Sequence, residues 1–180
     1  MATKGQSTVG TQLYVLNTSV SPHVVLLIPQ VKGFSPTLGG KRKKIDISNM
    51  DSAGYDENAG GRAAPPEATG EMVLDMTNTG HQAIKALFEA GAQGTIGDVE
   101  LYIGNSDANG VPPTIVAGHL VPPQTTSPKH WTRSGSLVTG YIATFQPKYA
   151  DDDVIRADFG FQISGAGKMS VKGDLSTKTY

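Results

Sequence analysis

The stretch "TNTGHQAIKALFEAG", residues 77–91, is the one segment of the chain that has a helical sequence pattern. Four apolar residues recur at the spacing of a single helical face: Ala83, Ile84, Leu87 and Phe88. Thr79 and Gln82 have the spacing of an N-terminal capping box, and Gly91 is a typical C-terminal residue. The sequence therefore predicts a helix over residues 79–90 whose apolar face packs against a sheet.

Segments with the pattern of β-strands lie on both sides of this helix. Apolar and polar residues alternate in residues 70–77, in residues 97–104 and most clearly in residues 154–164. In the last of these, the apolar positions share one face: Ile155, Ala157, Phe159, Phe161 and Ile163. Further candidates are residues 12–16, 23–28, 43–48, 114–121, 136–145 and 168–171. About eight or nine strands with one flanking helix predict a mainly β fold, either a β-sandwich or a small barrel.

Composition is consistent with one domain over residues 1–180 and places limits on its setting. The chain is 38% hydrophobic, and its 22 glycines and 11 prolines suit a fold with many turns. There is no cysteine, and no apolar run approaches the roughly 18 residues that a membrane-spanning helix needs. The N-terminus lacks the apolar segment of a secretory signal. We therefore expect synthesis in the cytoplasm and no membrane association.

The sequence contains no pattern typical of a catalytic site. Four histidines occur without the spacing of a zinc site: His23, His81, His119 and His130. The three aspartates at 151–153 lack the spacing of a calcium loop and fit a solvated turn, and residues 164–168 lack that of a phosphate-binding loop. These observations predict a protein that is not an enzyme and holds no metal and no cofactor.

Charged residues are segregated along the chain. Residues 1–45 contain no acid, and their bases include the run "KRKK" at 41–44. Residues 46–108 carry eleven acids against two bases, Arg62 and Lys85. This order suits a subunit whose basic surface meets the acidic surface of an identical neighbour, unless the fold interleaves the two segments. The basic run could also bind phosphates, but a net charge of −1 favours an interface patch or a solvated strand edge.

Residues 49–69 form a long, small-residue and polar stretch that predicts a loop between two strands. Loops of this length in compact domains commonly have a function, and this one contains no catalytic pattern. We expect it to contact another molecule, as we do for two extended termini, 1–11 and 173–180. The candidate contact residues in the loop and the basic run are Asp51, Tyr55, Asp56, Glu57, Arg62, Lys41, Arg42 and Lys43.

The order of these segments resembles the major tail tube proteins of long-tailed, siphovirus-type bacteriophages. The shared pattern is a strand that leads into a long polar loop (43–71), then "GEMVLDM", the helix and "GDVELYI". The resemblance covers about residues 24–172. It implies a β-sandwich subunit that forms rings, expected to be hexameric, in which the inner strands join into one barrel.

The same resemblance implies partners and a location. Rings would stack into a tube through which genomic DNA passes during ejection without specific binding. The loop 49–69 would be the stacking loop, and the two arms would lock adjacent rings. The partners implied are further copies of the chain and the tape measure, tail terminator and tail tip proteins, and the location is the virion tail. The Pro-rich "APPEAT" departs from the family pattern, and residues 105–113 have no assigned role.

Two alternatives remain at this point. One is a monomeric β-sandwich that binds or decorates a carbohydrate or capsid surface, and the other is a tube protein like those of type VI secretion. A carbohydrate-binding face needs several exposed aromatic side chains, whereas this chain has one tryptophan, Trp131, and six scattered tyrosines.

Overall fold

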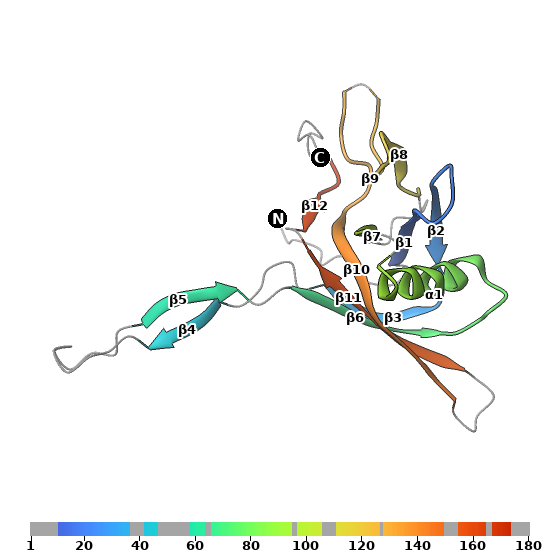
Figure 1. The fold of residues 1–180 in the computed structure, drawn as a ribbon. Coiled ribbons are helices and arrows are strands. Elements are labelled where there is room, and N and C mark those ends of the chain that lie inside the picture. Colours follow the sequence, from blue (N-terminus) through green and yellow to red (C-terminus); the bar gives the residue numbers. More distant parts are fainter. Residues whose placement is uncertain are drawn as a thin grey trace.

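The computed structural model describes residues 11–36, 42–46, 58–63, 66–94, 97–105, 111–126, 128–149, 155–164 and 167–173. These residues form a mainly β fold with one helix, α1 (Thr79–Ala92), which confirms the predicted fold class (Figure 1). The strands in this part of the chain are β1 (Gln12–Asn17), β2 (Val24–Ile28), β3 (Val31–Pro36), β4 (Arg42–Asp46), β5 (Asn58–Ala63), β6 (Glu67–Val73), β7 (Val99–Gly104), β8 (Thr114–Val116), β9 (His119–Val121), β10 (Gly135–Lys148), β11 (Arg156–Ile163) and β12 (Lys168–Ser170). Beyond the nine predicted segments, β3 and β5 are new, and residues 114–121 form two strands instead of one.

Strand β10 joins two half-sheets into one antiparallel sheet. The strand order is β2-β1-β7-β10-β11-β6-β3, with β12 also paired to β10. The first part of β10 pairs with β7 up to Gly140, and the second part pairs with β11 from Gly140 to Lys148. We call β2, β1, β7 and the start of β10 the first half-sheet, and the end of β10, β11, β6 and β3 the second half-sheet. The described sheet is not a closed barrel, so the architecture is closer to the predicted sandwich.

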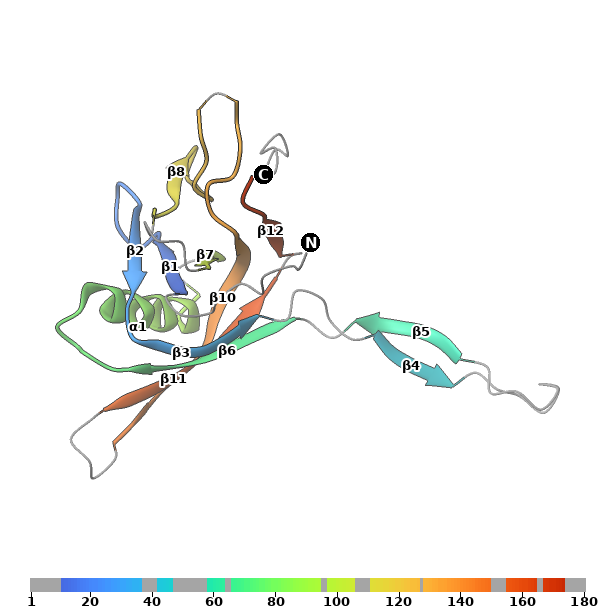
Figure 2. The same cartoon turned by 180° about the vertical axis from the view of Figure 1, so that it is seen from behind.

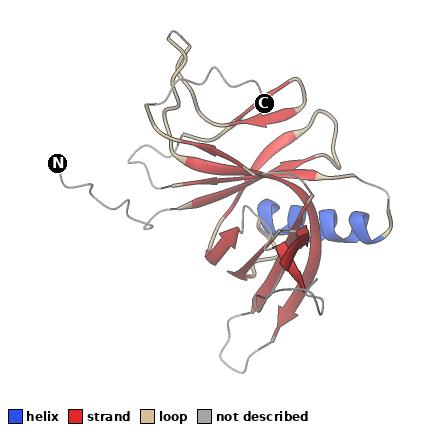
Figure 3. Cartoon of the chain, turned by 90° about the vertical axis from the view of Figure 1, so that its left-hand side faces the viewer, coloured by secondary structure: helices blue, strands red, loops and turns tan. Residues whose placement is uncertain are grey.

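The main hydrophobic core lies between the two half-sheets and the helix. It draws buried side chains from β1, β2, β6, β7, β10 and β11. Helix α1 contributes Ala83, Ile84 and Leu87, and Phe88 packs at its edge with its ring 6.3 Å from that of Phe145. Figure 3 shows the helix lying where the upper and lower groups of strands diverge. The apolar face quoted above is thus the surface by which α1 meets the sheet.

The helix begins at Thr79, as predicted, but its N-cap residue and its C-terminal end differ from the predicted ones. Asn78, one residue before Thr79, is the N-cap, and its side chain accepts a hydrogen bond of 2.9 Å from the backbone N–H of Gly80. Gln82 does not complete a capping box, because its side-chain amide donates to the carbonyl of Met76. The helix runs through Gly91 to Ala92, and Gly94 is the residue with the left-handed backbone (φ 66°) that follows it.

Strand β6 ends at Val73, earlier than the alternation predicted, because residues 75–78 form a hydrogen-bonded turn. Two hydrogen bonds from Thr77 reach the Asp75 carboxylate and lower the pKa of that group. The fully buried His81 accepts from the backbone N–H of Asp75 through Nδ1 and donates to the carbonyl of Pro29 through Nε2. Met76, which the alternation placed on the dry face, is therefore exposed. Ile155 was also wrongly placed on the buried face, since it precedes β11 and is exposed.

A second, smaller core covers the other face of the first half-sheet. It contains Tyr14, Leu16, Tyr102, Leu120 and Leu137, and burial raises the pKa of Tyr102. The strand β9 that supplies Leu120 is fixed to β7 by Glu100, whose carboxylate accepts from the backbone N–H of Leu120 at 2.5 Å and contacts His119 Nδ1 at 2.8 Å. The first half-sheet is consequently packed on both faces.

Two hairpins lie outside the large sheet. Strands β8 and β9 form one, with a tight turn at residues 117–118. Strands β4 and β5 form the other, which extends away from the rest of the fold (Figures 1 and 2). The predicted loop 49–69 is therefore wrong for residues 58–63 and 67–69, which are strands; glycines and small residues hid the pattern of β5. No helix in the described residues is long and apolar enough to cross a membrane.

Candidate assembly surfaces

The second half-sheet has one face that no described element covers. One side of it forms the main core through residues such as Met72, Phe159 and Phe161. Since side chains alternate across a strand, the neighbouring residues point to the opposite side. We call this opposite side the open face; it carries Lys32, Glu67, Thr69, Glu71, Tyr141, Thr144, Gln146, Lys148, Arg156, Asp158 and Gln162.

The open face is polar and electrically balanced. Its three cations, Lys32, Lys148 and Arg156, match three carboxylates, Glu67, Glu71 and Asp158. Two of the cations are paired across strands: Lys148 Nζ lies 2.5 Å from Asp158 Oδ2, and Arg156 Nη1 lies 2.8 Å from Glu71 Oε1. These half-exposed pairs contribute little to stability, so their main effect is on the electrostatic potential of the surface.

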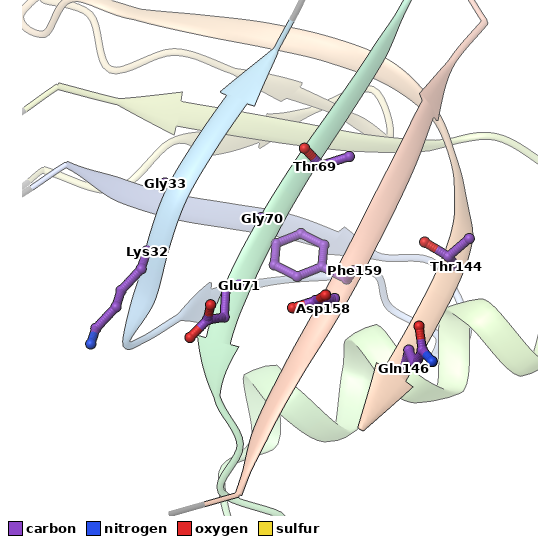
Figure 4. Close-up of a pocket in the computed structure, with 9 residues that line it drawn as sticks. All are labelled: Lys32, Gly33, Thr69, Gly70, Glu71, Thr144, Gln146, Asp158 and Phe159. Atoms are coloured by element: carbon purple, nitrogen blue, oxygen red, sulfur yellow. The ribbon is translucent and has the colours of Figure 1, made fainter. Parts of the chain in front are cut away.

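The same face is hollowed. A shallow depression of about 560 Å³ runs across the four strands, and Figure 4 shows Lys32, Glu71, Asp158 and Gln146 in a row along it. Gly33 adds no side chain to this lining, and Phe159 is buried, with its side chain in the main core on the other side of the sheet. A smaller depression continues beside it at Thr69 and Thr144. The open face thus has a shallow depression that polar side chains line across its four strands.

The second half-sheet also ends in two unpaired strand edges. On one side, β3 pairs with β6 alone among the described strands. On the other side, the pairing of β7 with β10 stops at Gly140, so residues 141–148 pair only with β11 in this part of the chain. Exposed strand edges carry free N–H and C=O groups that can pair with another chain. The half-sheet could therefore be extended from both ends.

A buried arginine holds a neighbouring loop against the first half-sheet. Arg133 donates to the carbonyls of Gly104 at 3.0 Å, Asn105 at 2.7 Å and Val111 at 3.2 Å, and its guanidinium lies 5.8 Å from the ring centre of Tyr14. Gly104 is required beside it, since a Cβ there would lie 2.5 Å from the guanidinium. Residues 105 and 111 of the unassigned insertion 105–113 are anchored in this way.

Most of the contact residues predicted from sequence fall where the structure describes no side chain. Lys41, Asp51, Tyr55, Asp56 and Glu57 lie outside the described residues. Arg42 and Lys43 lie in β4 and Arg62 lies in β5, so the structure places all three on the β4–β5 hairpin. The termini 1–10 and 174–180 also lie outside the described residues.

The sequence interpretation missed the open face. Its signal was present in the polar positions of the alternating segments, such as Glu71 in residues 70–77 and Asp158 and Gln162 in residues 154–164. Alternation in one strand predicts which residues face away from the core, but it does not say which strands lie side by side. Only the pairing of β6 with β11 and of β11 with β10 brings them onto one surface.

Solved structures share this fold at low sequence identity. One is a chain of the cryo-EM structure of the anti-feeding prophage baseplate, 6-fold symmetrised. Its TM-score is 0.58 at 9% sequence identity, and the match covers 94% of this chain and 97% of that chain. The SPP1 tail tube, a hybrid solid-state NMR and cryo-EM structure, has a TM-score of 0.58 at 10% sequence identity. The match covers 93% of this chain and 78% of that chain. The PVC sheath/tube terminator of an extracellular contractile injection system has a TM-score of 0.55 at 10% sequence identity. The match covers 94% of this chain and 100% of that chain. At these identities the likeness concerns the fold alone.

Family membership rests on the sequence. No curated protein matches the chain. A family model described as "Phage tail tube, TTP, lambda-like" matches residues 4–173, which confirms the resemblance seen in the strand–loop–strand–helix–strand order. The family is one of structural tail proteins and is not an enzyme family. The chain therefore belongs to the lambda-like phage tail tube family and is a structural component of the virion tail.

Proposed function

We propose that the chain assembles into closed rings that stack into the tail tube, and that the tube is the conduit for genomic DNA during ejection. The observation that carries this proposal is the pair of unpaired edges, β3 and residues 141–148 of β10, at the two ends of one half-sheet. In a ring of identical subunits, β3 of one copy would pair with β10 of the next. Because strand directions alternate from β10 to β3, this new pairing would be antiparallel, like the others.

Six subunits per ring is the number we propose. A chain with the same fold occurs in a baseplate structure with 6-fold symmetry applied, which supports this number by analogy. Joining the second half-sheets edge to edge would then close a barrel around the lumen and leave no exposed edge.

Stacking of the rings is assigned to the parts of the chain that extend from the body. The β4–β5 hairpin projects from the large sheet, and an isolated two-stranded hairpin is only marginally stable in water. We propose that it packs on a neighbouring subunit, with Lys41, Arg42 and Lys43 opposite the acid-rich segment 46–108 of that neighbour. Residues 1–11 and 173–180 are proposed to lock adjacent rings. The tape measure, tail terminator and tail tip proteins are the further partners proposed for the lumen and the two ends.

Disulfide cross-linking tests the edge pairing. Because the chain has no native cysteine, every disulfide must join introduced cysteines. Lys32→Cys on β3 is combined in turn with Thr144→Cys, Gln146→Cys or Lys148→Cys on β10. Within one chain, β6 and β11 separate these positions by three strand spacings, about 14 Å, which is beyond the reach of a disulfide. Oxidation of assembled protein should therefore give, for at least one pair, a ladder of covalent multimers on denaturing gels.

The single-cysteine variants are the controls, because one cysteine per chain can link no more than two chains. A ladder that ends at the hexamer supports a closed six-membered ring. Dimers as the largest product of all three double variants would contradict the pairing of β3 with β10.

A further inference from the structure

We propose that the open face lines the lumen of the tube, and that its ion pairs prevent its cations from binding the phosphates of passing DNA. This inference rests on the proposed function and adds which surface meets the DNA and how that surface avoids retaining it.

The two half-sheets differ in how many of their faces are covered. The first half-sheet is packed on both faces, by the main core and by the second core under β9. The second half-sheet has the main core on one side, and no described element covers the other. If rings form by joining the edges of the second half-sheet, its open face becomes a continuous surface around the ring. The main core and helix α1 lie on the other side of the second half-sheet, so the open face fits the inner wall of a tube better than the outer wall.

The open face is hydrophilic. A water-filled channel for DNA needs a hydrophilic wall. Between the ends of its strands, the open face exposes Thr69, Thr144 and Gln146 with only one large apolar side chain, Tyr141. The opposite flank, around β8 and β9, exposes Ile115 and Val116. Exposed apolar side chains of that kind are more typical of protein contact surfaces. The flank therefore suits the outside of the tube or a contact with another protein.

The charges of the open face are repeated throughout a tube. In a ring, each cation of the open face occurs once per subunit, and stacked rings repeat it along the tube. Unpaired cations on such a wall would bind DNA phosphates by releasing counterions. Lys148 is instead held 2.5 Å from Asp158, and Arg156 is held 2.8 Å from Glu71. The third cation, Lys32, lies opposite Glu71 in the register of β3 and β6. Asp158 and Glu71 thus offset the positive charges of the cations beside them, and we call this effect masking.

The test removes one masking carboxylate. Tubes of the Asp158→Asn variant are assembled with fluorescent short duplex DNA, treated with nuclease, and pelleted. Wild-type tubes should protect little DNA. Asp158→Asn tubes, with Lys148 unmasked throughout the lumen, should protect about tenfold more at low salt and lose this excess as salt is raised. The double variant Asp158→Asn with Lys148→Gln should return to the wild-type level.

Glu89→Gln is the matched control. Glu89 forms an exposed ion pair of 2.7 Å with Lys85 on helix α1, so this variant changes the net charge equally but frees a cation away from the open face. DNA bound to it should remain accessible to nuclease. Protection by Asp158→Asn tubes no greater than by Glu89→Gln tubes would overturn the inference, whereas wild-type protein that never forms tubes would contradict the proposed function itself.

A labelling experiment covers the case in which Asp158→Asn fails to assemble. In tubes of otherwise native sequence, Gln146→Cys should react with a small maleimide but not with a large polyethylene glycol maleimide. Ala86→Cys, on the exposed side of α1, should react with both. Equal reaction of the two cysteines with the large reagent would place the open face outside the lumen and overturn the inference.

Discussion

Replacing Leu87 with aspartate is expected to lower the free energy of unfolding of the isolated subunit by about 4 kcal/mol or more. Leu87 is 1% exposed and lies in the main core, where α1 meets the sheet. The substitution removes a buried apolar side chain and introduces a carboxylate for which that core offers no hydrogen-bond donor. Since small domains are stable by only about 5–15 kcal/mol, this loss is a large part of the total free energy of unfolding. Urea titration followed by the fluorescence of Trp131, the single tryptophan, measures the change.

Ala86→Asp is the matched control, because it adds the same charge one residue away on the exposed side of the helix. Its expected cost is about 0.7 kcal/mol, the difference in helix propensity between the two residues. Similar unfolding midpoints for Leu87→Asp and Ala86→Asp would mean that the helix face is not packed in the subunit and serves a contact between subunits instead.

Replacing Arg133 with methionine is expected to cost about 3 kcal/mol. The guanidinium is buried and donates to three backbone carbonyls, of Gly104, Asn105 and Val111. Methionine fills much of the volume but donates no hydrogen bond, so these carbonyls would lose their donor in a buried site. Because the carbonyls belong to the backbone, no second substitution can remove them. The same urea titration gives the change in stability.

Arg156→Met is the control, since it makes the same substitution at an exposed arginine that is paired with Glu71. Its expected cost is below about 1 kcal/mol. Arg133→Lys should lie between the two, because lysine keeps the charge but cannot reach all three carbonyls at once. If Arg133→Met were no more destabilising than Arg156→Met, the buried arginine would not be what holds residues 105 and 111 in place.

The sequence predicted the elements whose signal is local. The helix was found because Ile84 and Leu87 recur with its period, and β11 was found because Ala157, Phe159 and Phe161 alternate with polar residues. Elements without a local signal were missed. Strand β5, "NAGGRA", contains neither alternation nor β-branched residues, and its pairing with β4 is what defines it.

The surfaces that matter for assembly depend on pairing between distant strands. Glu71 and Asp158 are neighbours only because β6 pairs with β11, and residues 141–148 form a free edge only because β7 ends its pairing at Gly140. Arg133 had no distinguishing mark in the sequence, since an isolated arginine between Thr132 and Ser134 is ordinarily exposed. A contact that joins residues far apart in the chain leaves no periodic pattern to detect.

The most direct test of the central claim is a cryo-EM reconstruction of the assembled protein. We predict a tube of stacked rings in which β3 of each subunit pairs antiparallel with residues 141–148 of β10 in the next. Glu71, Asp158 and Gln146 should face the lumen, and Arg42 and Lys43 should face carboxylates of a neighbouring subunit. A tube whose subunits meet through β8 and β9, with β3 unpaired and the basic side chains in the lumen, would contradict this account.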